Sequence, residues 1–75
     1  MDTLTYKGCK IKSTPNKLYD GGYSVNGITE MNFESHDIHI LTENLGIPDE
    51  EWKHNTEQEA DAVFKKYAIQ YIDNH

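Results

Sequence analysis

The histidine residues are the first candidates for chemistry in this sequence, because their spacing could serve a metal ion. His36 and His39 flank Asp37, and His54 follows farther along the chain. If residues 37–41 form a strand, side chains three residues apart point to opposite faces, so His36 and His39 would not converge. The sequence also lacks the ligand spacings of zinc sites, such as C-x-x-C or H-E-x-x-H. We therefore predict surface histidines and no bound cofactor.

Cys9 is the only cysteine and the second candidate. The neighbouring lysines Lys7, Lys10 and Lys12 would favour the thiolate that a nucleophile requires. Its position two residues before Ile11 in an expected strand instead predicts a small core side chain. A single thiol cannot close an intrachain disulfide, which is consistent with a reducing compartment.

The carboxylates form the largest cluster of charge, around the start of the expected C-terminal helix. Its members are Asp49, Glu50, Glu51, Glu57, Glu59 and Asp61. Acid–base catalysis would require two of them to face each other in a cleft with their pKa values pushed apart. A chain of 75 residues offers little room for such a cleft. We therefore predict no catalytic residue and no enzymatic activity.

Composition limits the classes of partner. The chain carries a net charge of −6 and its seven basic residues are all lysines. Nucleic-acid binding depends on basic charge and on the bidentate contacts of arginine, so we expect no nucleic-acid partner. No apolar run could span a membrane, and the first residues do not resemble a signal peptide. A single soluble cytoplasmic domain covering residues 1–75 is the expectation.

The last third of the chain predicts an amphipathic helix. Apolar residues recur at steps of three and four and would share one face. They are Ala60, Val63, Phe64, Tyr67, Ala68, Tyr71 and Ile72. Thr56 and Glu59 have the spacing of a capping box, in which each side chain satisfies a backbone N–H near the helix start. The helix should run from Thr56 to Asp73.

The first half of the chain predicts short strands. Residues 4–6 and 9–12 flank Lys7-Gly8, and the apolar positions change parity between them. This change suits either a tight turn between two strands or a glycine bulge within one strand. Residues 13–17 have the composition of a loop.

Two further strands are expected before the helix. A turn at Asp20-Gly21-Gly22 precedes a strand over residues 23–31, in which Gly27 predicts a bulge. A third strand covers residues 37–41. In the segment 42–55 we expect a turn at Asn44-Leu45-Gly46 and one helical turn from Pro48 to Trp52. The predicted class is α+β, with the order β-β-β-α: a small antiparallel three-stranded sheet packed against one long C-terminal helix.

Four apolar residues outside the expected core suggest an interaction surface. Ile69 lies opposite the centre of the apolar stripe at roughly 100° of rotation per residue, and Ala62 lies on the same side. Trp52 and Tyr19 fall in expected loops. Single exposed apolar residues are common, so these four residues are candidates for contact with a partner or a second copy.

Four short motifs in this sequence resemble those of a family of small bacterial proteins of unknown function. The motifs are Tyr6-Lys7-Gly8-Cys9-Lys10-Ile11, Asp20-Gly21-Gly22-Tyr23, Thr56-Glu57-Gln58-Glu59-Ala60 and Tyr71-Ile72-Asp73. The resemblance implies a β-β-β-α fold and a bacterial cytoplasmic origin, and it carries no functional residues. The sequence departs from the family pattern at Cys9, where an aromatic residue would stand, and in the long segment 32–54.

Two functions from different classes remain. The first is a non-enzymatic protein-interaction module, homodimeric or with another protein partner, that binds through a strand edge or the Ile69 side of the helix. The alternative is a small ligand- or divalent-metal-binding protein that uses His36, His39 and the loop around Trp52. The sequence alone does not identify the partner.

Overall fold

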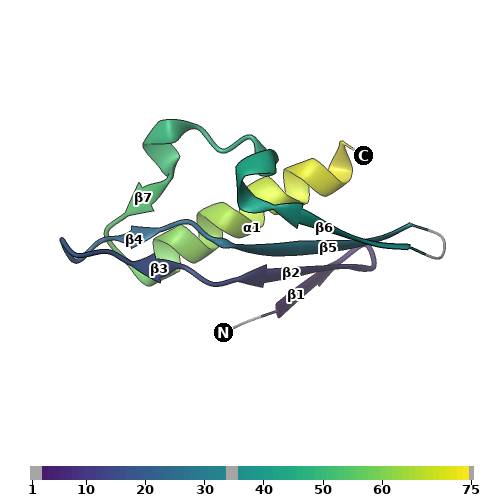
Figure 1. The fold of residues 1–75 in the computed structure, drawn as a ribbon, viewed down its shortest axis with the longest axis horizontal. Helices are drawn as coiled ribbons and strands as arrows, with labels where there is room; N and C mark the ends of the chain where they lie inside the picture. The colour runs from purple at the N-terminus through teal and green to yellow at the C-terminus, as the bar shows by residue number, and fades with distance from the viewer. Residues whose placement is uncertain (1–2, 34–35, 75) are drawn as a thin grey trace.

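The computed structural model describes residues 3–33 and 36–74, without the side chains of Asn32, Phe33 and His36. It shows an α+β fold in which seven strands form two antiparallel sheets that pack against one C-terminal helix (Figure 1). Within these two described segments, no helix has the length and apolar character needed to cross a membrane.

The larger sheet has four strands in the order β1-β2-β5-β6. They are β1 (Thr3–Tyr6), β2 (Cys9–Ser13), β5 (Gly27–Phe33) and β6 (His36–Leu41). The smaller sheet has the order β3-β4-β7, with β3 (Asn16–Lys17), β4 (Tyr23–Ser24) and β7 (Lys53–His54). The helical elements are η1 (Thr42–Leu45), η2 (Asp49–Glu51) and α1 (Glu57–Asp73). The predicted α+β class is therefore correct. The predicted single sheet of three strands is replaced by two sheets of four and three strands.

A long central hairpin connects the two sheets. One leg contains β2 and then β3, the other contains β4 and then β5, and Figure 1 shows these legs running along the length of the molecule. Both legs pass from one sheet to the other at the same point along the hairpin. There the Thr14 amide donates to the Asn26 carbonyl at 2.9 Å. Pro15 cannot donate to a strand partner, which accounts for the break between β2 and β3. The predicted strand over 23–31 is therefore two strands, and Gly27 begins β5 instead of forming a bulge.

The first turn is a tight hairpin turn. Lys7 and Gly8 have φ values of 50° and 80°. Positive φ at both central residues is characteristic of the type I′ turn, whose twist matches that of the flanking strands. Tyr6 then pairs directly with Cys9, so the structure selects the turn from the two sequence-based alternatives.

The helix prediction is confirmed at both ends. Thr56 is the N-cap, and its hydroxyl oxygen accepts from the Glu59 amide at 3.1 Å. The Glu59 carboxylate accepts a hydrogen bond from the Thr56 hydroxyl at 3.0 Å. The buried stripe of α1 repeats every four residues and comprises Ala60, Phe64, Ala68 and Ile72. The other predicted apolar positions, Val63, Tyr67 and Tyr71, are partly buried along its flank.

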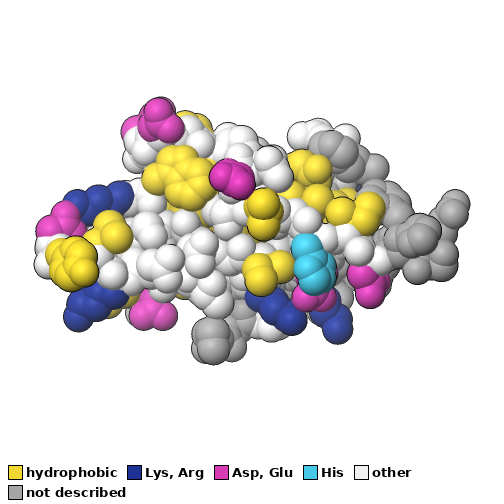
Figure 2. Space-filling model, viewed as in Figure 1, with side chains coloured by type: hydrophobic (Ala, Val, Ile, Leu, Met, Phe, Trp, Pro, Cys, Tyr) yellow, Lys and Arg dark blue, Asp and Glu magenta, His cyan; other side chains and the backbone are white. Residues whose placement is uncertain are grey.

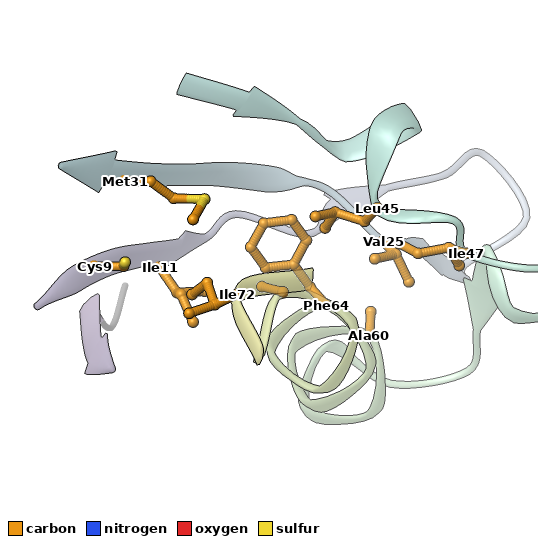
Figure 3. Close-up of a cluster of buried hydrophobic side chains, with 10 residues drawn as sticks. Cys9, Ile11, Val25, Met31, Leu45, Ile47, Ala60, Phe64 and Ile72 are labelled. Carbon is orange, nitrogen blue, oxygen red and sulfur yellow. The ribbon is translucent and has the colours of Figure 1, made fainter. Parts of the chain in front are cut away.

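The core lies between α1 and the strands, with the Phe64 ring near its centre (Figure 3). The strands contribute Cys9, Ile11 and Met31, and Val25 joins them from the junction of the two sheets. The burial of Cys9, at 8% exposed, confirms that its side chain belongs to the core.

The segment 42–55 differs from its prediction. The expected turn around Asn44 is the 3₁₀ helix η1, which ends at Gly46 with φ of 75°. The expected helical turn is the 3₁₀ helix η2, which Pro48 precedes as N-cap. Leu45 and Ile47 belong to the core, which explains why this irregular segment is ordered against α1. The strand β7, which pairs with β4, had no signal in the sequence.

Asp73 connects the end of α1 to the first turn. Its carboxylate accepts from Lys7 Nζ at 2.8 Å and from the Tyr6 hydroxyl at 2.9 Å. The hydrogen bond from Lys7, followed by that from Tyr6, lowers the pKa of Asp73 below its ordinary value of 3.8.

This lowered pKa predicts a contribution to stability that is present above the ordinary pKa and is lost as pH falls through the folded-state pKa. In Asp73→Asn we expect a smaller difference in urea midpoint between neutral and acidic pH than in the wild type. Lys7→Gln should reduce the same difference, because it removes the same ion pair. An unchanged pH dependence in both variants would contradict the role assigned to Asp73.

Candidate functional site

The edge strand β6 presents apolar side chains on both of its faces. The register pairs Ile28 with Leu41 and Met31 with Ile38. Because successive side chains point to opposite faces, Ile38 and Ile40 lie on the helix side and Leu41 lies on the open side. The main contacts of α1 with the larger sheet are with β2 and β5. As a result Ile38, on the helix side, stays 41% exposed; Leu41, on the side away from α1, is 55% exposed.

Contacts of Thr42, the residue after β6, show the direction of the backbone N–H and C=O groups in β5 and β6. The Thr42 hydroxyl donates to the Gly27 carbonyl at 2.9 Å and accepts from the Gly27 amide at 3.2 Å. The backbone groups of Gly27 therefore point toward the β6 side. Direction alternates along an antiparallel strand, so those of Thr29 also point to β6, where Thr29 pairs with Ile40.

The same alternation along β6 leaves three residues with outward backbone groups. Ile38 and Ile40 direct their N–H and C=O groups to β5, and Asp37, His39 and Leu41 direct theirs away from the sheet. In the part of the chain that the structure describes, no strand pairs with this side of β6. The strand also contains no proline and no lysine, the residues that commonly protect an edge.

The opposite edge of the sheet is less accessible to a partner. β1 has only four residues, and Thr3 and Thr5 are its exposed positions. The hydroxyl of Tyr6 is held by Asp73. Short edge strands offer few backbone groups for pairing, so β6 is the better candidate of the two.

An open groove of about 460 Å³ adjoins the end of β6. It is lined by Thr14, Asn26, Gly27, Ile28, Leu41, Thr42, Glu43 and Trp52. The Trp52 indole N–H donates to the Ile47 carbonyl at 3.0 Å, which fixes the ring. Figure 2 shows hydrophobic side chains beside a histidine on the face that it presents, with charged side chains around them. The groove extends the apolar surface of Ile28 and Leu41.

A charged row crosses the open face next to this apolar surface. Glu30 pairs with Lys10 on one side and His39 on the other, and Lys12 reaches it diagonally from β2. Its Oε1 atom is 3.3 Å from Lys12 Nζ and 3.8 Å from His39 Nε2. Opposite charges on neighbouring strands stabilise a sheet modestly, and this row compensates the Glu30 carboxylate within the molecule.

The histidines of the sequence analysis do not come together. His39 lies on the open face of β6, whereas His54 lies in β7 of the other sheet with Nε2 2.8 Å from the Glu51 carbonyl oxygen. The side chain of His36 lies outside the described residues. Among the residues that are described, no group of three or more His, Cys, Asp or Glu could hold a metal ion.

Several predicted carboxylates have structural partners. The Glu59 carboxylate accepts from the hydroxyl of the N-cap Thr56 at 3.0 Å. The Glu51 carboxylate accepts from the Tyr67 hydroxyl at 3.2 Å, and Asp61 pairs with Lys65 at 2.8 Å. Burial together with the hydrogen bond to Glu51 raises the pKa of the Tyr67 hydroxyl. These contacts connect η2 to α1 and cap the helix.

The four residues predicted as an interaction surface do not form one patch. Tyr19 is fully exposed in the turn between β3 and β4. Ala62 is exposed on α1, but Ile69, which was expected on the exposed side of the helix, is partly buried and packs against the core. Of the four, Trp52 alone lines the groove beside β6.

The sequence of β6 itself indicates an unusual edge strand. The segment Ile38-His39-Ile40-Leu41 places apolar residues on both faces of a strand. A strand of this kind is either central or a hydrophobic edge. Ile28 pairs with Leu41 and is 46% exposed, but only the strand register shows that it belongs to the same apolar surface.

Comparison with known proteins finds no matching family model, no matching curated protein and no matching solved structure.

Proposed function

We propose that this chain is a small, non-enzymatic protein-interaction module that binds another polypeptide by β-strand addition along β6. The observation that carries the proposal is the outward edge of this strand, where Asp37, His39 and Leu41 offer backbone N–H and C=O groups in a row. Strand addition uses such groups for affinity and neighbouring pockets for specificity.

The apolar surface around the edge supports this reading. An added strand would lie next to Ile38 on the helix side and next to Leu41 on the open side, both of which are substantially exposed. Burial of apolar surface contributes roughly 25 cal/mol per Å² before the costs of association. The groove beside Trp52 provides a place for one side chain of the incoming strand.

The direction of the backbone groups provides a sharp test. Proline has no N–H and is tolerated on an edge strand where the N–H faces solvent. In His39→Pro we therefore expect a folded protein whose edge cannot pair. The matched control is His39→Gln, which keeps the backbone N–H and changes only the side chain.

The measurement is capture of partners from a lysate of the source cells by the three folded proteins, analysed by mass spectrometry. We expect the same captured polypeptide with the wild type and His39→Gln, and its loss with His39→Pro. Circular dichroism would test whether His39→Pro is folded. Equal capture by all three proteins would show that binding does not use this edge.

A further inference from the structure

We infer that the polypeptide that pairs with β6 is a second copy of the same chain, in an antiparallel arrangement with His39 on the twofold axis. This inference rests on the proposed strand addition and names its partner. The two four-stranded sheets would join into one continuous sheet, and both copies of α1 would lie on the same side of it.

The backbone of β6 is complementary to itself in this register. With His39 opposite its own copy, Asp37 lies opposite Leu41 of the second copy, and the reverse pair follows by symmetry. All three residues direct their N–H and C=O groups outward, so each facing pair exchanges two hydrogen bonds. The interface would therefore contain about six backbone hydrogen bonds.

The side chains are complementary in the same register. Ile38 lies opposite Ile40 of the second copy, twice by symmetry, on the helix side of the sheet. These positions are the non-hydrogen-bonded pairs, whose side chains approach most closely. Ile38 is 41% exposed in one copy, and this contact would cover it with an apolar partner.

Other registers are less favourable. A shift of the axis to Asp37 places two carboxylates directly opposite each other, which is destabilising. A shift to Ile40 places Asp37 opposite Glu43, which is an acid in the 3₁₀ helix η1 and not in a strand. A shift to Ile38 leaves Leu41 opposite position 35, before β6 begins. With His39 at the centre, every outward residue of β6 faces another residue of β6.

The charged side chains are compatible with this arrangement in spite of the net charge of −6. The open face of each copy carries Lys10 and Lys12 on β2, Glu30 on β5 and Asp37 on β6, so both signs are present on it. The Glu30 carboxylate is already close to Lys12 and His39 of its own chain. Asp37 lies directly opposite Leu41 of the second copy and not directly opposite a carboxylate.

A cysteine on the twofold axis tests the register. In His39→Cys the two Cα atoms would lie about 5.5 Å apart, within the range of a disulfide. In the control Leu41→Cys, on the same strand and face, the two cysteines would lie about 13 Å apart along the strands, beyond disulfide reach. The native Cys9 is buried and is common to both variants.

Under mild oxidation with glutathione we expect about tenfold more cross-linked dimer in His39→Cys than in Leu41→Cys, measured on non-reducing gels. We also expect the wild type to sediment as a dimer at high concentration, and His39→Pro to weaken its self-association by about tenfold or more.

Two results would overturn the inference: equal cross-linking in the two cysteine variants, or a wild type that stays monomeric up to millimolar concentration. In either case the proposed strand addition would still stand if His39→Pro abolished capture of another polypeptide. Both the proposed strand addition and the inferred dimer would be contradicted if His39→Pro changed neither capture nor self-association.

Discussion

Gly27→Ala is expected to destabilise the fold more than any other single methyl group added at a glycine. A Cβ atom at this position would overlap the Lys12 carbonyl oxygen and would lie 2.6 and 2.7 Å from two atoms of the Phe64 ring. The added methyl group would require both the Lys12 backbone and the buried Phe64 ring to shift. Overpacking of a core lowers the free energy of unfolding by about 3 kcal/mol or more in severe cases. We expect a fall in melting temperature of roughly 15 °C or more, measured by circular dichroism.

Gly8→Ala is the matched control. A Cβ atom at Gly8 meets nothing within 4 Å, although φ there is 80°. The cost should be limited to the left-handed conformation, about 1 kcal/mol. The double variant Gly27→Ala/Phe64→Leu should recover part of the loss, because it removes one of the two overlaps. Equal destabilisation by Gly8→Ala and Gly27→Ala would contradict the close approach at Gly27.

Phe64→Ala is expected to have the other large effect. Phe64 is 0% exposed and is the largest fully buried side chain among the described residues. Truncation of a buried phenylalanine costs about 3–5 kcal/mol through lost burial and the cavity that remains. Small domains have total stabilities near the lower end of about 5–15 kcal/mol, so we expect a largely unfolded protein at physiological temperature.

Val63→Ala provides the comparison on the neighbouring position of α1. Val63 is only partly buried, so its truncation should lower the urea midpoint much less than Phe64→Ala. If the two truncations lowered the midpoint equally, Phe64 would not occupy the centre of the core.

The sequence predicts the helix well because its signals are local. The four-residue repeat of apolar side chains and the pair Thr56 and Glu59 act within one or two turns of the same element. At Lys7-Gly8 the parity of the flanking residues left two alternatives, a turn or a bulge. The φ values of these two residues decide that question.

The division of the sheet could not be predicted from local patterns. β7 has two residues and exists because it pairs with β4, far away in the sequence. The amide of Val25 donates to the carbonyl of Trp52, which turns the central hairpin toward β7. Such pairings depend on the core formed by Leu45 and Ile47, and an irregular segment gives no periodic signal for them.

The candidate site was predicted only in part. A strand edge was among the surfaces considered, and Trp52 lines the groove beside β6. The exposure of Ile28 and Leu41 follows from their position on the open face of the larger sheet, away from α1, and this position depends on the strand register. The outward direction of the His39 backbone follows only from the contact between Thr42 and Gly27.

Hydrogen exchange of the β6 amides tests the proposed use of this edge most directly. At low concentration the amides of Ile38 and Ile40 should be protected by β5, and those of Asp37, His39 and Leu41 should exchange rapidly. As self-association or partner binding saturates, the three outward amides should become protected. Rapid exchange of these three amides in the saturated complex would contradict strand addition along β6.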